Sequence, residues 1–207
     1  MSGHSLTAPV TATSTDPDTV TAAPGEVTIR GTVEVAACVA GALTIAACAI
    51  AAVVNVALAA AARRWLAYPF AGIPARPGEA AAIFLHNVRA LTAVGGLLIV
   101  AQSPYWAGKM NGGPVHRAIR RAGEALLAAG VSANVIMVGA SLGAYGSRMV
   151  RAVLPHGPIE LAAYALALAV YIQGRHRPLP TSHALAIPAM SMSLLALAAL
   201  LETFVNV

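Results

Sequence analysis

Five long apolar runs, separated by short polar or proline-containing segments, dominate the chain. They cover residues 35–62, 80–102, 125–147, 161–172 and 184–201. A helix needs about 20 mainly apolar residues to cross a bilayer, so the fourth run spans it only if residues 152–160 are included. No run shows the alternation typical of a half-buried strand. The pattern predicts an all-α, polytopic membrane protein: a bundle of about five transmembrane helices with a helix break at the start of the fourth.

The N-terminal segment differs from the rest of the chain. Residues 1–25 are mostly Thr, Ser, Ala, Pro and Asp with no apolar period, so they bury too little surface to offset chain entropy. Asp16, Asp18 and Glu26 precede the first apolar run, whereas a secretory signal begins with basic residues. We therefore expect a disordered tail over residues 1–32 and a single five-span transmembrane domain over residues 33–207.

Composition strengthens the membrane assignment, since 58% of the 207 residues are hydrophobic and only 10% are charged. The net charge is +5, but the basic residues fall singly or in pairs between the runs, which is typical of topology anchors rather than of a nucleic-acid face. We expect membrane lipid as a partner and no nucleic acid.

The distribution of basic residues favours one orientation in the cell membrane. An inside N-terminus places seven of them inside: Arg30, Lys109, Arg117, Arg120, Arg121, Arg175 and Arg177. The opposite orientation places six inside: Arg63, Arg64, Arg76, Arg89, Arg148 and Arg151. Without Arg89, which lies within the second run, the second set falls to five. The positive-inside rule thus favours a multi-pass protein with its N-terminus inside and its C-terminus outside.

The two cysteines give no sign of redox or metal chemistry. Cys38 and Cys48 lie ten positions apart in one run, which on a straight helix is about 15 Å and too far for a disulfide. We expect both to be buried small hydrophobes. The chain contains no complete metal, nucleotide or haem motif, so no cofactor is expected.

The second run contains three polar residues, His86, Asn87 and Arg89, that are costly in lipid unless they have partners. His86 and Arg89 are three positions apart and share a helical face. Either these residues form a site or they brace the bundle, with Arg89 pairing with an intramembrane carboxylate; bracing is favoured. The adjacent Gly95-Gly96 pair is expected to admit a neighbouring helix.

The third run is rich in glycine, alanine and serine, which let helix backbones touch, so it is expected to be the central helix. Residues 139–143 read Gly-Ala-Ser-Leu-Gly and match the nucleophile elbow of serine hydrolases, with His156 and Glu160 as apparent triad partners. That elbow requires a strand that enters it from an α/β sheet, and the sequence pattern predicts no strands to form such a sheet. An intramembrane serine protease using Ser141 escapes this objection and is a remote alternative.

A helix break is expected where the fourth span begins. Pro155 disfavours helix at the residue before it, Gly157 permits unusual dihedral angles, and Pro158 suits a first helical position. The new helix should start at Pro158 with Glu160 in its first turn. His156 and Glu160 then either line a binding cavity at a helix N-terminus or form a capped kink, in which Glu160 accepts from backbone N–H groups or pairs with Arg151.

Four short segments carry a resemblance to a known family. They are Ile-Phe-Leu-His-Asn-Val-Arg at 83–89, Asn134 with the glycine-rich stretch 139–143, Leu-Pro-His-Gly-Pro-Ile-Glu-Leu at 154–161, and Leu-Leu-Glu-Thr-Phe-Val at 200–205. These segments are spread over roughly residues 80–207. They resemble the stage II sporulation protein M family of bacterial integral membrane proteins. The resemblance implies that Ser141 is a packing residue. It also implies a membrane scaffold for peptidoglycan-degrading partners, the role of the family's named member during engulfment of the forespore.

Three functions follow as expectations. The first is a non-enzymatic membrane scaffold or assembly subunit that organises other membrane proteins, including peptidoglycan hydrolases, an ATPase subunit or further copies of itself. The second is a transport or permease-like subunit, and the remote third is the intramembrane protease. The candidate intramembrane polar and structural site comprises His86, Asn87, Arg89, Asn134, His156, Gly157, Glu160 and Glu202.

Overall fold

The computed structural model describes residues 27–68, 70, 74–109 and 112–205, and within these the chain is helical with no strand. The helices are α1 (Ile29–Val53), η1 (Val54–Leu58, a π-helix), α2 (Ala59–Leu66), α3 (Pro77–Trp106), α4 (Pro114–Tyr145), α5 (Ser147–Val153), α6 (Gly157–Gly174) and α7 (Thr181–Phe204). Five helices in this part of the chain are long and apolar enough to cross a membrane: Ile29–Leu66, α3, α4, α6 and α7. The expected all-α polytopic bundle is confirmed.

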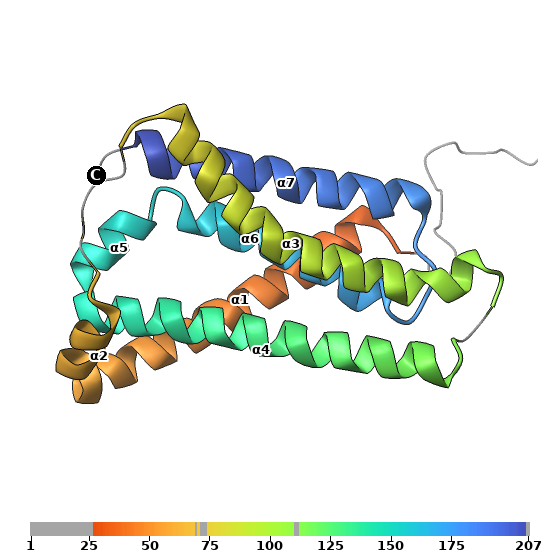
Figure 1. Ribbon diagram of the computed structural model, residues 1–207, viewed down its shortest axis with the longest axis horizontal. Coiled ribbons are helices and arrows are strands. Elements are labelled where there is room, and N and C mark those ends of the chain that lie inside the picture. Colours follow the sequence, from red (N-terminus) through yellow and green to blue (C-terminus); the bar gives the residue numbers. More distant parts are fainter. Residues whose placement is uncertain (1–26, 69, 71–73, 110–111, 206–207) are drawn as a thin grey trace, which may run out of the picture.

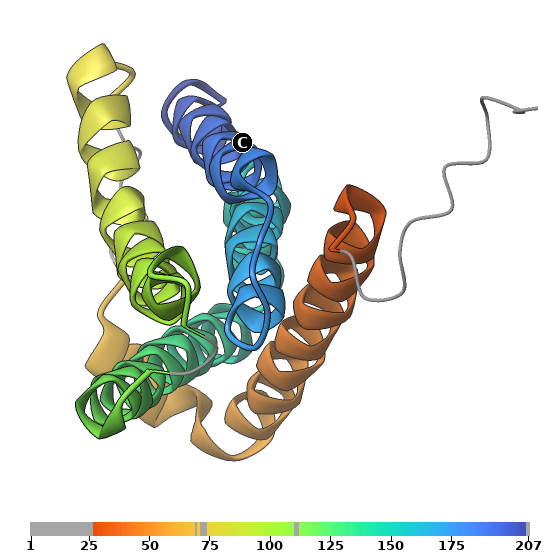
Figure 2. The ribbon, with the colours of Figure 1, turned by 90° about the vertical axis from the view of Figure 1, so that its right-hand side faces the viewer.

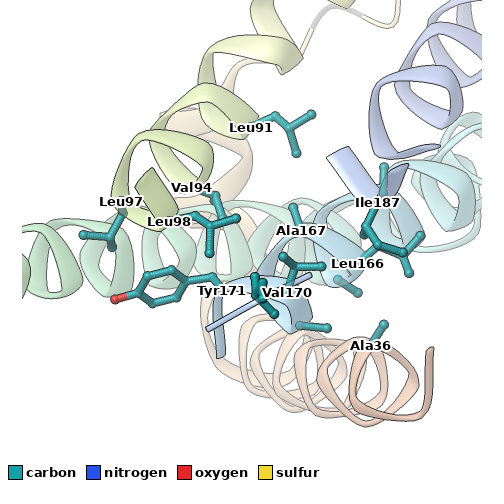
Figure 3. Close-up of a cluster of buried hydrophobic side chains, with 14 of the residues drawn as sticks. Ala36, Leu91, Val94, Leu97, Leu98, Leu166, Ala167, Val170, Tyr171 and Ile187 are labelled. Carbon is teal, nitrogen blue, oxygen red and sulfur yellow. The ribbon is translucent and has the colours of Figure 1, made fainter. Parts of the chain in front are cut away.

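Helix α6 occupies the centre of the bundle. It packs against α1, α3 and α7, while α4 lies on α1 and α3 at one side (Figures 1 and 2). Leu98 of α3 and Ile187 of α7 belong to one buried cluster with Leu166, Val170 and Tyr171 of α6, in which Ile187 lies beside Leu166 (Figure 3). After Glu160, α6 carries no charged residue and is apolar on every side, which is typical of a buried helix.

The expectation that the third span is central is wrong, because α4 is peripheral and mostly exposed. Its small residues do admit neighbouring helices, but only at particular positions. A Cβ added to Gly139 would stand 2.7 Å from the Ala47 carbonyl oxygen of α1, and one added to Gly143 would stand 2.8 Å from Cβ of Val54. Gly139 and Gly143 thus bring α4 against the first span, whereas a Cβ added to Gly123 of α4 would stand 2.7 Å from Leu97 Cδ1 of α3.

Two helices begin earlier than the sequence predicts. Helix α1 starts at Ile29, inside the segment assigned to the tail, because the Thr28 hydroxyl accepts a hydrogen bond from Gly31 N at 3.1 Å and caps it. The boundary at residue 32 is therefore wrong, while the rest of the predicted tail, residues 1–26, lies outside the described residues. Helix α4 starts at Pro114, well before the third apolar run at residue 125, so Arg117, Arg120 and Arg121 lie on it rather than between the helices.

The helix break before the fourth span is confirmed. Helix α6 begins at Gly157 with Pro158 in its first turn, one residue before the expected start. Its 18 residues rise about 27 Å, close to the hydrocarbon thickness of about 30 Å, so residues 152–156 are not needed for spanning. A second break, not expected, separates α4 from α5 at Gly146, whose φ of 56° favours glycine.

Other local expectations are also corrected. Cys38 and Cys48 are exposed on α1 rather than buried, because α1 meets its neighbours with other faces. Gly95 and Gly96 of α3 admit no neighbouring helix within the described residues, since an added Cβ would meet nothing within 4 Å at either position. Small residues permit close packing but do not impose it.

Candidate functional site

A hydrogen-bonded cluster joins α3 to the first two turns of α6. The Asn87 side-chain amide donates to Glu160 Oε1 at 2.5 Å, and the Tyr164 hydroxyl donates to the Asn87 carbonyl oxygen at 3.2 Å. Glu160 and Tyr164 are four residues apart on one face of α6, so both reach the same residue of α3. All three are half-buried. We call Asn87, Glu160 and Tyr164 the α3–α6 clamp.

Glu202 of α7 lies close to this clamp. It is half-buried in the last turns of α7 and near enough for its charge to act on Glu160. Within the described residues, no arginine forms an ion pair with Glu160 or Glu202. Two carboxyl groups and one amide therefore lie near the end of the bundle where α6 begins and α7 ends. The alternative in which Glu160 pairs with Arg151 is not found among the described residues, where Glu160 accepts from Asn87 instead.

The remaining predicted site residues do not join the clamp. His86 and Arg89 are exposed on α3, so the predicted pairing of Arg89 with a carboxylate is wrong for the chain as described. Asn134 is exposed on α4 and donates to the Gly130 carbonyl of its own helix at 3.0 Å. Sharing an apolar span does not bring polar side chains to one place, because they point in different directions around their helices.

His156 and Gly157 shape the start of α6. The His156 side chain makes no capping bond to the helix, whereas its carbonyl accepts from Ile159 N at 3.0 Å and from Glu160 N at 3.1 Å. A Cβ added to Gly157 would clash with the side chain of Val153 on α5. The two residues thus allow the tight passage from α5 into α6, but the expected capping by Glu160 is not found in the described residues, where Glu160 accepts from Asn87 instead.

Sequence reasoning missed the residue that closes the other end of the bundle. Gln102 of α3 is fully buried; its amide donates to the Gly174 carbonyl at 2.5 Å and the Arg177 carbonyl at 2.9 Å, and its oxygen accepts from Leu179 N at 3.1 Å. Gln102 therefore satisfies three backbone groups where α6 turns into α7. The available signal was a lone glutamine at the end of an apolar run, where polar groups need partners.

A charged network joins α4 to the same end of α6. Glu124 accepts a hydrogen bond from the Tyr171 hydroxyl at 2.7 Å and lies 4.0 Å from Arg120 Nε and 3.9 Å from Arg175 Nη1. Arg120 also donates to the Arg175 carbonyl at 3.0 Å. The sequence predicted both arginines as loop charges, but α4 extends far enough for Arg120 to lie on it.

Helix α1 is tied to α6 by a third contact. The buried Thr32 hydroxyl donates to Gln173 Oε1 at 2.6 Å. Polar contacts from α1, α3 and α4 therefore all end on the same central helix, near one or the other of its ends. This arrangement fixes the positions of the helices around α6.

The hydrolase-like motif has no triad geometry in the described residues. Ser141 forms no hydrogen bond there to His156 or Glu160, and its neighbours Gly139 and Gly143 pack on α1. The same part of the chain contains no group of three or more His, Cys, Asp or Glu side chains placed to hold a metal ion.

Comparison of the chain with protein-family models, curated proteins and solved structures gives no match. The resemblance to the stage II sporulation protein M family thus rests on the sequence segments quoted above. Of the residues in those segments, Asn87 and Glu160 meet in the clamp, and Glu202 lies beside them.

Proposed function

We propose that this chain is a non-enzymatic scaffold or assembly subunit of the cell membrane, which organises other membrane proteins around a braced helical bundle. The proposal is supported by the inward-facing polar side chains of the bundle, which join one helix to another. Asn87, Gln102 and Glu124 tie helices together at the two ends of α6. Groups bonded in this way brace the bundle and make it a stable platform for a partner.

The proposal rests mainly on the side of α3 that faces away from the other helices. His86, Arg89, Ala93 and Gly96 recur at helical spacing, share one face and are all exposed. Within the described residues, neither the His86 nor the Arg89 side chain has a hydrogen bond or ion pair. A Cβ at Gly96 would meet nothing within 4 Å of it there. We call these four residues the outer α3 face.

The depth of this face makes unpaired polar groups costly. Because α6 just crosses the hydrocarbon core, Glu160 lies about 5 Å inside one boundary. Asn87 is bonded to it, and Arg89, two residues further along α3, is about 3 Å deeper. An arginine within the membrane is stabilised by a carboxylate or carbonyl partner. A neighbouring transmembrane helix that bears such a group fits a face of small residues around Arg89.

The resemblance noted in the sequence suggests which partners to seek. Peptidoglycan-degrading enzymes or their membrane anchors are the first candidates, followed by an ATPase subunit and a second copy of this chain. With the N-terminus inside, the end of the bundle that carries the α3–α6 clamp faces outward, towards the cell wall.

Site-specific photo-crosslinking tests the proposal. A photoreactive residue at Ala93, on the outer α3 face, should give a protein adduct in intact membranes, whereas the same residue at Ala52, exposed on α1, should not. Arg89→Leu should abolish the Ala93 adduct. Asn134→Leu is the matched control, since Asn134 is exposed but bonded within its own helix, and should leave the adduct unchanged.

The transport alternative makes the opposite prediction. If Ala93 yields only lipid adducts and the purified chain in vesicles supports a solute flux that Glu160→Gln abolishes, the scaffold proposal is wrong. No specific contact in the described residues favours transport or proteolysis, so neither is proposed.

A further inference from the structure

An apolar groove opens between α1, α2 and α4, away from the polar clusters. It has a volume of about 610 Å³. Only apolar residues line it: Ala49, Ile50, Val53, Val54, Leu58, Ala61, Ala62, Trp65, Ile136 and Ala140. We call this hollow the α1–α4 groove.

The groove results from a bend in the first span. Gly139 and Gly143 draw α1 against α4 as far as Val54, where the π-helical turn of η1 redirects the chain. Helix α2 then crosses the end of α4, where Arg63 Nε donates to the Ala144 carbonyl at 2.6 Å. Alanine at 61, 62 and 140 leaves the space between them unfilled.

The end of the groove near Trp65 is basic and aromatic. Besides Arg63, which bonds to the backbone of α4, α2 and α5 carry three exposed arginines: Arg64, Arg148 and Arg151. Arg148 lies over the Phe70 ring at 4.1 Å, and Phe70 packs edge-on against Tyr145, whose hydroxyl meets the backbone of α2. Residues 54–68 and 140–153 contain no aspartate or glutamate. We call the three arginines the arginine rim.

We propose that the α1–α4 groove binds one acyl chain of an anionic phospholipid, with the lipid phosphate at the arginine rim. Trp65 and the rim supply an interfacial belt at the headgroup level, and the apolar walls run from it towards Ala49. From Trp65 to Ala49 the chain follows a bent helical path of about 24 Å, and the roughly 15 Å from the membrane interface to the midplane of a bilayer lies within that length.

The size of the groove favours a lipid chain over a protein helix. A helix about 10 Å wide and about 24 Å long occupies on the order of 1,900 Å³, roughly three times the volume of the groove. A helix from a second copy would therefore lie mostly outside these walls, whereas a single hydrocarbon chain is thin enough to lie between them. The charge of the rim selects a headgroup with net negative charge.

Tryptophan quenching by brominated lipids measures this binding directly. The chain has two tryptophans, so Trp106→Phe leaves Trp65 as the only reporter. Brominated phosphatidylglycerol and brominated phosphatidylcholine are compared in separate vesicles. The apparent affinity measured by quenching of Trp65 should be at least fivefold higher for phosphatidylglycerol than for phosphatidylcholine. An arginine near an anionic surface contributes about fivefold in binding, so Arg64→Gln should lower the preference by about that factor.

Matched controls separate the site from general membrane charge. Arg121→Gln removes an exposed arginine at the other end of the bundle and should leave the Trp65 preference unchanged. Ala61→Leu, which fills the groove, should reduce quenching by both lipids, whereas Ala60→Leu on the outside of the same helix should not. A reporter with Trp106 alone should not respond to Arg64→Gln.

Two results overturn the proposal. Equal quenching by both lipids, unaffected by Arg64→Gln, means that the rim selects no headgroup. Quenching that falls as protein is added at constant lipid shows that another copy of the chain covers the groove. Circular dichroism of each variant checks that helix content is retained, and Arg64→Gln keeps the test valid if Ala61→Leu fails to fold.

Discussion

The α3–α6 clamp gives the sharpest energetic prediction. Asn87→Ala removes the amide that donates to Glu160 at 2.5 Å, and Glu160→Ala removes the acceptor. A hydrogen bond to a charged group contributes about 1.5–3 kcal/mol in soluble proteins, but side-chain bonds within membranes average about 0.6 kcal/mol with a maximum of about 1.7 kcal/mol. Because this bond joins an amide to a half-buried carboxyl group, we expect a coupling free energy of about 1–1.7 kcal/mol.

A double-mutant cycle isolates that coupling. Unfolding free energies of the wild type, both single variants and the double variant are measured in mixed micelles by titration with a denaturing detergent. The losses of the two single variants should sum to more than the loss of the double variant, by an amount equal to the coupling free energy, because either substitution breaks the same bond. Glu160→Gln should cost less than Glu160→Ala, since its side-chain oxygen still accepts from Asn87.

The control is Asn134→Ala on α4, which is exposed and bonded only within its own helix, and it should show no coupling to Glu160→Ala. If Asn87→Ala and Glu160→Ala add within about 0.3 kcal/mol, the clamp is not an energetic contact and the bracing argument fails.

The other predictions concern packing and the second end of the bundle. Gln102→Leu should lower the free energy of unfolding by about 2–3 kcal/mol, because it leaves three backbone groups between α6 and α7 unsatisfied, and detergent titration measures this loss. Gly143→Leu should lower the free energy of unfolding by about 1–3 kcal/mol, because the larger side chain forces α1 away from α4. Gly41→Ala, which has open space around it, should leave that free energy unchanged or raise it slightly. Similar melting temperatures for the two glycine variants would contradict the close approach.

Local patterns predicted much of the architecture. The five spans follow from the length of each apolar run, and the break before the fourth span follows from Pro155, Gly157 and Pro158. These features depend on backbone geometry and hydrophobic length, which nearby residues determine. Asn87 and Glu160 were also recognised as polar groups that need partners in lipid, because that cost follows from the residue type alone.

The sequence by itself determined the helices and the polar residues that each one carries. Only the tertiary structure decided that α6 rather than α4 is central, that Asn87 rather than Arg89 meets Glu160, and that Gln102 closes the far end. The contacts between Asn87 and Glu160 and between Gln102 and Gly174 join residues more than 70 positions apart. Whether such residues meet depends on the rotation and crossing of whole helices, which the packing of all five spans sets together.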